Sequence, residues 1–240
     1  MERFFVNRQT ITNDHAVITG EDMTHITRVL RSGAGDMFIL CDGCNMEYDA
    51  TIEKIEKHGV TLRLDNERVC ENEPPIEVTL MQALPKAGKL ELVIQKCVEL
   101  GVYAIQPLYT ARCVVTKESF AKKHERYRRV AYEAAKQSRR GMIPKVLPLV
   151  ELGACAFKFD YVLFAYENER ERTLRRVLQA AKAGGAKRIA MIIGPEGGFE
   201  EEEARFLTGL GIQPLSLGKR VLRTETAGMA MLAMVMYELA

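Results

Sequence analysis

From Ile76 onward, short apolar runs alternate along the chain with longer segments of helical pattern. Runs such as 78–84 and 188–193 are mostly apolar, which is typical of strands buried on both faces of a sheet. Because a helical segment follows each run, the sequence predicts an α/β fold with helices on both faces of a parallel sheet. The other predicted strands are 104–108, 161–165 and 213–217, and the predicted helices are 89–100, a long basic helix ending near 138, 173–183, 200–210 and 226–239.

The first 72 residues have a different pattern, in which short segments alternate between apolar and polar residues. Tyr48, Ala50 and Ile52 alternate with polar neighbours, as expected for a half-buried sheet. Asp42 and Gly43 lie between two such segments, and both residues tolerate the positive φ of a tight hairpin turn. One helix is predicted around 26–30, and a small β-barrel fits the whole pattern.

A polar run that ends in two prolines separates these patterns at 71–75. Consecutive prolines interrupt regular structure, so we expect a domain boundary there. The predicted domains are therefore 1–72 and 73–240.

The net charge of +2 hides an uneven distribution of charged residues. Domain 1–72 holds 8 basic and 13 acidic residues, whereas residues 112–145 alone hold eleven basic residues and three glutamates. Such an excess attracts polyanions such as RNA, but it is equally typical of a solvated helix face. Phe120, Tyr127 and Tyr132 lie in this segment and are candidates either for stacking on bases or for the buried face of a helix.

Several classes of site lack their motifs in this sequence. Neither 85–89 nor 218–220 has the glycine spacing of a dinucleotide-binding loop or a P-loop. Cys41 and Cys44 have C-x-x-C spacing without a second pair of ligands, which favours thiols beside a turn and predicts no metal. The most apolar stretch, 227–237, is shorter than the roughly 18 residues of a membrane span, so we expect no membrane partner and a cytoplasmic protein.

A glycine-rich loop, Gly194-Pro195-Glu196-Gly197-Gly198, follows the buried run that ends at Ile193. Ligands of open α/β sheets bind beyond the carboxyl ends of the strands, and glycines let a flat ligand approach the backbone. Four consecutive glutamates follow at 200–203, which stabilise a helix start and repel phosphate. The loop therefore favours a cationic or neutral ligand, although a plain strand-to-helix turn is the alternative.

A second segment, 216–227, lies between the last predicted strand and the last predicted helix. It places Arg223 and Glu225 at another strand end, where the two loops would form one pocket. The final helix is apolar nearly all round, which predicts burial in the core or partly against a second subunit.

These segments resemble the RsmE-type ribosomal RNA small-subunit methyltransferases of the SPOUT superfamily. The resemblance rests on the loop 194–198, on 215–218 with 221–227, on 96–101, on 133–144 and on 25–36. It implies a PUA-like N-terminal barrel that helps to hold RNA, and an α/β domain with a deep trefoil knot. It also implies a homodimer that uses S-adenosylmethionine to methylate N3 of one uridine in 16S ribosomal RNA, with ribosomal RNA or the small ribosomal subunit as partner.

The resemblance also implies the site residues. The cofactor-binding set is Phe164, Ala165, Glu167, Ile193, Gly194, Pro195, Glu196, Gly197, Gly198, Ser216, Leu217, Gly218, Leu222, Arg223, Thr226 and Ala227. The expected RNA contacts are Lys86, Arg112, Gln137, Ser138 and Arg140.

The implied chemistry assigns catalytic roles. Uridine N3 carries a proton at neutral pH, so the enzyme must remove the proton or stabilise the anion. Arg223, or alternatively Arg140, would stabilise the anion, and Glu196 or Glu225 would accept the proton. A different RNA nucleotide as substrate, and a non-catalytic RNA-binding protein, remain alternative interpretations.

Overall fold

The structure is a computed structural model that describes residues 1–86 and 88–240. It divides into two compact units. The first comprises Met1–Glu73 and Ala135–Ile143, and the second comprises Pro74–Ala134 and Pro144–Ala240. This grouping differs from the predicted domains, because the sequence interpretation placed residues 135–143 in the second domain.

The first unit is built on a five-stranded sheet with strand order β1-β3-β4-β5-β2. Its strands are β1 (Arg3–Phe5), β2 (His15–Ile18), β3 (Met37–Cys41), β4 (Met46–Glu56) and β5 (Gly59–Val69), with the short helical segments η1 (Arg8–Thr10), α1 (Gly20–Thr24) and η2 (His25–Val29). Along β4 the side chains of Ala50 and Ile52 are buried, which confirms the predicted alternation. The Asp42–Gly43 turn joins β3 to β4 as predicted, with Gly43 at φ 73°.

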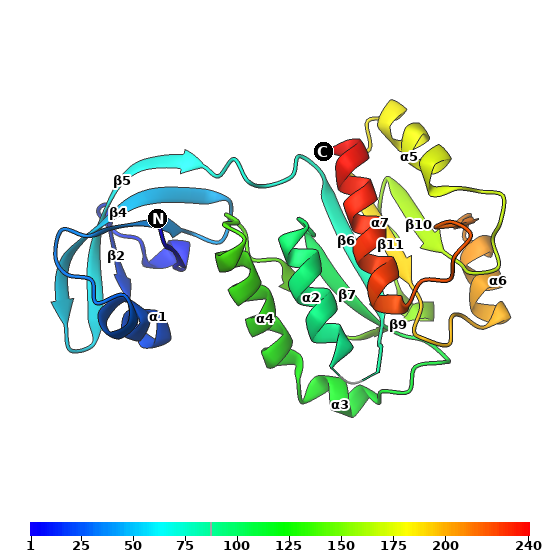
Figure 1. Cartoon of the computed structure of the whole chain (residues 1–240), viewed down its shortest axis with the longest axis horizontal. Helices are drawn as coiled ribbons and strands as arrows, with labels where there is room; N and C mark the ends of the chain where they lie inside the picture. The colour runs from blue at the N-terminus through cyan, green and yellow to red at the C-terminus, as the bar shows by residue number, and fades with distance from the viewer. Residues whose placement is uncertain (87) are drawn as a thin grey trace. The chain divides into compact units, whose positions relative to one another are not determined.

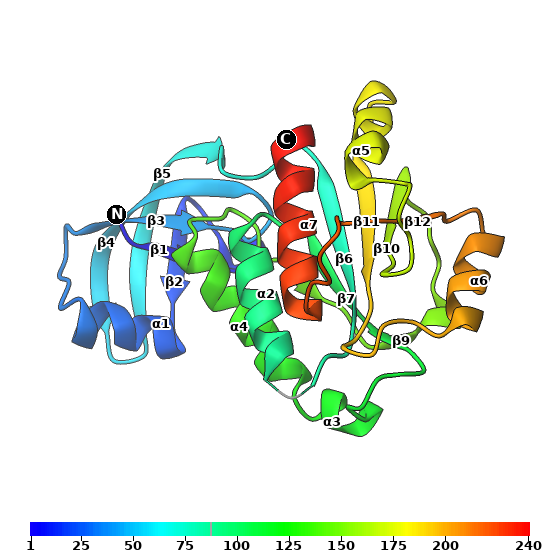
Figure 2. The same ribbon diagram turned by 45° about the vertical axis from the view of Figure 1, so that its right-hand side comes forward.

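The second unit contains a sheet in which all recorded strand pairs are parallel, with order β12-β10-β11-β6-β7-β8 and β9 paired to β7. Its strands are β6 (Glu77–Ala83), β7 (Ala104–Tyr109), β8 (Lys145–Val146), β9 (Val150–Glu151), β10 (Tyr161–Ala165), β11 (Arg188–Ile193) and β12 (Pro214–Leu215). Its helices are α2 (Lys89–Glu99), α3 (Lys117–Ala121), α4 (His124–Gln137), α5 (Leu174–Ala183), α6 (Glu201–Gly209) and α7 (Thr224–Leu239), with a short η3 (Leu152–Ala154). The predicted α/β architecture is thus confirmed (Figures 1 and 2).

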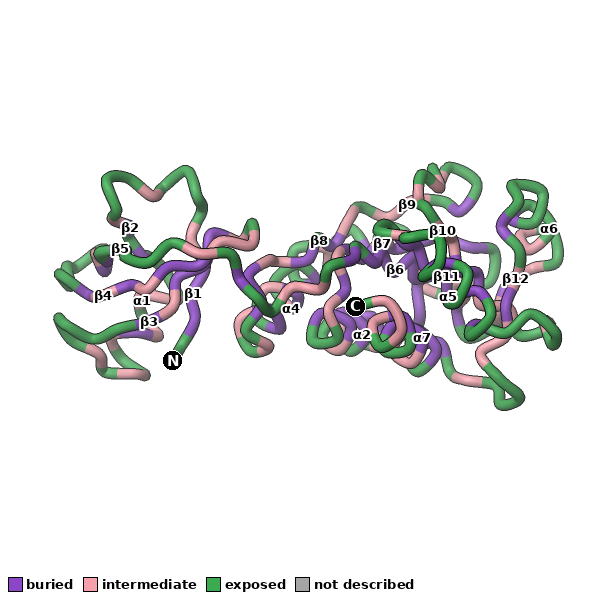
Figure 3. The backbone as a smooth tube through the Cα atoms, turned by 90° about the horizontal axis from the view of Figure 1, so that it is seen from above, coloured by how far each residue is buried: buried purple, intermediate pink, exposed green. Residues whose placement is uncertain are grey.

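Both faces of this sheet are covered. Helix α7 contacts both α2 and α5, and it packs on β6 and β11 (Figure 2). On the other face, Met81 and Ile192 pack in one cluster with Leu207 of α6. The central strands β6 and β11 are accordingly buried along most of their length (Figure 3).

Two predictions about helices are corrected by the structure. The predicted long basic helix is two helices, α3 and α4, because Thr116 caps a short helix that turns before His124. For helix α7 the structure excludes only the alternative of burial on every side in the core, since Met234 is 39% exposed and Tyr237 is 91% exposed. None of the helices in the described residues is long and apolar enough to cross a membrane.

Candidate functional site

A cavity of about 380 Å³ lies at the carboxyl ends of β10 and β11, beside the segment 216–223 and the first turn of α7. It therefore occupies the position where open α/β sheets bind ligands. The lining residues are Lys89, Ala165, Tyr166, Glu167, Arg170, Ile193, Gly194, Pro195, Glu196, Gly198, Ser216, Leu217, Gly218, Arg220, Val221, Leu222, Arg223, Thr224 and Ala227.

Most of the residues predicted to bind a cofactor line this one cavity, which unites the glycine-rich loop with the segment 216–227. Three of them do not. Phe164 lies in the core of the sheet, Gly197 accepts a hydrogen bond from Arg112 through its carbonyl, and Thr226 is exposed on α7. Sequence reasoning missed Lys89 and Arg170. The other lining residues that were not singled out lie within predicted stretches, Tyr166 between Ala165 and Glu167, and Arg220, Val221 and Thr224 in the segment 216–227.

Two glycines of the loop are required by close approaches. Gly198 has φ +69°, and a Cβ built there would lie 2.0 Å from Oε1 of Glu167. A Cβ on Gly194 would lie 2.9 Å from the ring of Phe199. At its glycines the loop therefore presents backbone to the cavity, as the sequence suggested, while Glu196 contributes a side chain.

A buried hydrogen-bond relay fixes the loop to α7. The Thr224 hydroxyl donates to the Gly194 carbonyl at 2.6 Å and accepts from Nε2 of Gln82 at 2.9 Å. Gln82 is fully buried at the end of β6, and Thr224 is only 5% exposed. Because the relay joins the ends of β6 and β11 to the first turn of α7, it sets the shape of one wall of the cavity.

Lys89, at the start of α2, links the glycine-rich loop to α7 through two ion pairs. Its ammonium lies 3.0 Å from Oε1 of Glu196 and 3.2 Å from Oε2 of Glu225. Burial raises the pKa of Glu196, but the hydrogen bonds from Lys89 and from backbone amides outweigh it and lower the pKa overall. Hydrogen bonds to the two carboxylates raise the pKa of Lys89. Glu196 therefore stays ionised and is a weak proton acceptor.

Arg223 is the N-cap residue of α7, is exposed and lines the cavity. Its guanidinium forms no ion pair with any other residue in the described part of the chain. A cation in this position is available to an incoming negative charge. Glu225, by contrast, is held by Lys89 and does not line the cavity.

Two arginines predicted to contact RNA form ion pairs with carboxylates of the same chain. Arg112 donates to both carboxylate oxygens of Glu200 and, at 2.6 Å, to the Gly197 carbonyl, so that it holds the glycine-rich loop. Glu200 in turn caps α6 in a capping box with Glu203, which confirms the helix-start role expected of these glutamates. Arg112 is thus a structural brace in this conformation.

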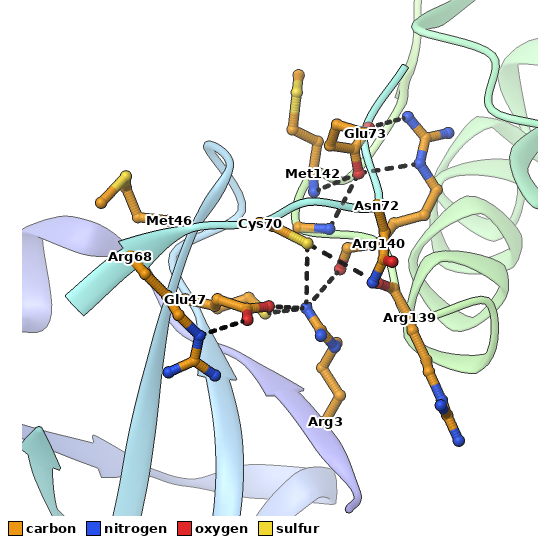
Figure 4. A network of polar contacts seen from close by, with 12 residues as sticks. Arg3, Met46, Glu47, Arg68, Cys70, Asn72, Glu73, Arg139, Arg140 and Met142 are labelled. Atoms are coloured by element: carbon orange, nitrogen blue, oxygen red, sulfur yellow. Dashed lines mark hydrogen bonds and ion pairs between the residues drawn. The ribbon is translucent and has the colours of Figure 1, made fainter. Parts of the chain in front are cut away.

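Arg140, the alternative anion stabiliser, belongs to the first unit and not to the cavity. Its side chain is 4% exposed and lies 2.6 Å from the carboxylate of Glu73, which also accepts from two backbone amides (Figure 4). Arg3 donates to the backbone carbonyl of Arg140 and bonds Glu47 in the same network (Figure 4). A cation so completely enclosed has a structural role, which the sequence spacing did not reveal.

The remaining predicted RNA contacts lie away from the cavity lining. Lys86 is exposed and donates only its backbone amide to Glu196, while Gln137 and Ser138 belong to the first unit. These contacts stay predictions. The expectation of buried rings is settled for two residues, since Phe120 and Tyr127 are 3% and 6% exposed and pack against each other.

Comparison with known proteins gives full-length matches. A family described as an RNA methyltransferase domain matches residues 72–236, and one described as an RNA methyltransferase PUA domain matches 18–65. The chain is 34% identical over 248 residues to ribosomal RNA small subunit methyltransferase E of Bacillus subtilis, covering 99% of this chain and 97% of that protein.

Solved structures agree with the sequence matches. Ribosomal RNA small subunit methyltransferase E from Neisseria gonorrhoeae, bound to S-adenosyl methionine, is 30% identical with a TM-score of 0.85, over 98% of this chain and 96% of the other. A methyltransferase from Legionella pneumophila, in complex with the cofactor SAM, is 34% identical with a TM-score of 0.84, over 97% and 96%.

Proposed function

The chain belongs to the RNA methyltransferase family with a PUA domain, and from that membership and the cavity we propose that it methylates N3 of a specific uridine in 16S ribosomal RNA. It is an S-adenosylmethionine-dependent ribosomal RNA methyltransferase. The single observation that supports the site is the union of the glycine-rich loop with the segment 216–227 around one cavity.

The residues present fit this cofactor. The cavity falls within the size range of small-molecule sites. Backbone of the glycine-rich loop and the apolar side chains of Leu217 and Leu222 offer walls for an adenosine, and Glu167 and Glu196 offer negative charge to a sulfonium or an ammonium. The bound cofactor supplies the electrophilic methyl group.

The chain's own residues supply positioning and charge. We assign Arg223 the role of stabilising the uridine anion, whose charge spreads onto O2 and O4 after N3 loses its proton. Lys89 pairs with Glu196 and Glu225 and helps to lower the pKa of Glu196, so the N3 proton passes to water beside the base and not directly to Glu196. The base must be unpaired or flipped, because N3 is hidden in a Watson–Crick pair.

A homodimer is the proposed assembly. The outer side of α7 and α2 exposes Met234, Tyr237 and Leu92, of which Leu92 is 44% exposed. Three large apolar side chains on two helices that contact each other are typical of a subunit interface. Sedimentation of the purified chain at micromolar concentration tests this, and a monomer would overturn it.

The finer fold features are proposals on the same basis. We propose that the sheet of the first unit closes as a PUA-like barrel that contacts RNA, and that 173–227 passes through the deep trefoil knot of the SPOUT fold. The support is the bridge between Thr173 and Ser216, which lays the start of α5 along the segment after β12. A protein that modifies ribosomal RNA would act in the cytoplasm, with ribosomal RNA or the small subunit as partner.

Mass spectrometry of ribosomal RNA from a strain that lacks the gene tests the function. We expect one methyluridine in 16S RNA to disappear and to return when the chain is supplied, but not when Arg223→Ala is supplied. An unchanged map of 16S modifications, with a loss in transfer RNA instead, would replace the substrate by the alternative one.

A further inference from the structure

A second cavity, of about 460 Å³, lies in the second unit at the carboxyl end of β7. Its walls come from Tyr109, from Lys117, Phe120 and Ala121 of α3, from His124 at the start of α4, and from residues 148–151. None of these residues takes part in the cofactor cavity.

Rings and a donor–acceptor pair line this second cavity. The rings of Phe120 and His124 pack with centroids 5.3 Å apart, and the Lys117 ammonium lies 4.8 Å from the centre of the Tyr109 ring. Lys117 also forms an ion pair with Glu151. The hydrogen bond from Lys117 lowers the pKa of Glu151, so the acceptor remains ionised at neutral pH.

Such a lining suits one class of ligand. The rings of Tyr109 and His124, which are only partly buried, accept a flat ring, while an ammonium and a carboxylate side by side offer a donor and an acceptor to its edge. Unpaired nucleobases are recognised in this manner, by rings on their faces and by hydrogen bonds on their edges. A purely apolar ligand would leave both charges without solvent.

The strand order places the second cavity close to the cofactor cavity. Only β6 lies between β11, which leads into the glycine-rich loop, and β7, which leads into the second cavity (Figure 1). Neighbouring strands are about 4.8 Å apart, so the two strand ends are separated by roughly 10 Å. Arg112, three residues after Tyr109, ties this strand end to the glycine-rich loop through the Gly197 carbonyl.

The surface beside the cavity is basic. Residues 117–129 hold six lysines and arginines against two glutamates. Lys117, Arg126 and Arg128 are paired with carboxylates of the chain, whereas Lys122 is exposed. A sugar–phosphate backbone entering the cavity would therefore meet positive charge.

We propose that the cavity formed by Tyr109, Lys117, His124 and Glu151 binds a nucleobase of the RNA substrate other than the base that is methylated. This rests on the proposed function, because the nucleotide reaches the cavity as part of the same RNA strand. The pocket anchors one neighbouring base and so fixes the register in which the target base reaches the cofactor. Lys117 donates to a ring carbonyl or nitrogen, and Glu151 accepts from an amino or imino group.

Filling the cavity tests the proposal. Ala121 is exposed and lines it, so Ala121→Trp places a ring in the space without removing a polar contact. Lys117→Ala removes the donor in a second, independent way. Ala183→Trp, at an exposed position at the end of α5, is the matched control. Circular dichroism melting checks that each variant folds.

The readouts are the dissociation constant for a 16S RNA fragment, the dissociation constant for S-adenosylmethionine, and kcat. Stacking of one base accounts for about a tenfold change in affinity, so we expect both cavity variants to weaken RNA binding about tenfold, with unchanged cofactor binding. Ala183→Trp should match the wild type. An abasic scan of the RNA should identify one non-target position whose loss weakens wild-type binding equally, but does not weaken Ala121→Trp further.

The outcomes separate the two proposals. If the wild type methylates the RNA and both cavity variants bind it as the wild type does, the nucleobase site is wrong and the proposed function stands. If every abasic position is additive with Ala121→Trp, the site is also wrong. If the wild type binds the cofactor but methylates no ribosomal RNA, the proposed function fails and the nucleobase site fails with it.

Discussion

The relay through Thr224 allows a quantitative test of how the cofactor cavity is built. Thr224→Val keeps the shape of the side chain but removes the hydroxyl that bonds Gly194 and Gln82. The Gln82 amide keeps its bond to the Ala83 carbonyl at 3.0 Å, so the principal loss is the partner of the Gly194 carbonyl. An unpaired buried polar group costs about 1–3 kcal/mol, so we expect about 2 kcal/mol of destabilisation.

For a chain of this length, that loss lowers Tm by about 4–8 °C. Because Gly194 and Thr224 both line the cavity, we also expect S-adenosylmethionine to bind roughly tenfold more weakly, which is about 1.4 kcal/mol. Thermal denaturation and calorimetric titration measure the two effects. The control is Thr226→Val, the same substitution at an exposed position of the same helix, which should change neither quantity.

A double substitution sharpens the test. Oε1 of Gln82 is buried without a hydrogen-bond partner among the described residues. Gln82→Leu in the Thr224→Val background therefore removes a polar group that has lost its main partner, and part of the stability should return. If Thr224→Val melts at the same temperature as Thr226→Val, the relay does not hold the loop and the reasoning is refuted.

Three further predictions follow from single positions. Arg223→Ala should abolish methyl transfer while S-adenosylmethionine still binds within a fewfold of the wild type, and calorimetry showing lost cofactor binding would contradict the anion-stabilising role. Gly141→Ala should lower stability by about 1–3 kcal/mol in a thermal melting assay, because the new Cβ would lie 2.4 Å from the Cβ of Cys70. Gly153→Ala is the control and should be tolerated, because the space around Gly153 is open. Hydrogen bonds from two backbone amides lower the pKa of Asp160. The ionised carboxylate therefore stabilises the fold above its unfolded pKa of about 3.9, and this stabilisation is lost as the pH falls through the lower pKa of the folded state. Asp160→Asn should flatten the decline of Tm below about pH 4, and an unchanged decline would exclude the effect.

The strands of the second unit were predictable because apolar content alone identifies a strand that is buried on both faces. Run 188–193 corresponds to β11 and run 161–165 to β10. The two-residue strands β8 and β9 carry too few residues to form a pattern, so they were not predicted. The turn between α3 and α4 was missed because both helices are basic and the segment has no glycine or proline.

The part of the cofactor cavity that is formed by backbone could be predicted from the sequence, whereas the part that depends on side-chain contacts was harder to predict. Three glycines and one proline in 194–198 mark a loop whose conformation depends on the local sequence. Gln82 and Lys89, by contrast, bond to residues more than 100 positions away in the sequence. The residues next to them in the sequence give no sign of these contacts. One signal was available for Lys89, since it begins a helix directly after a strand end, where side chains face the ligand edge of the sheet.

The basic segment 112–145 shows why a count of basic residues along a sequence overstates the number of cations that are free to bind a partner. At least six of its eleven cations form ion pairs with carboxylates among the described residues: Arg112 with Glu200, Lys117 with Glu151, Arg126 with Glu91, Arg128 with Glu125, Lys136 with Asp22, and Arg140 with Glu73. A cation that already has a carboxylate partner must break that pair before it neutralises a phosphate, so it adds little net free energy to RNA binding. The paired arginines instead fix the loops that shape the sites, as Arg112 does for the glycine-rich loop. We therefore expect the proposed recognition of RNA by the second unit to depend less on the size of its charge than on exposed cations such as Lys122, which follows Ala121 of the second cavity.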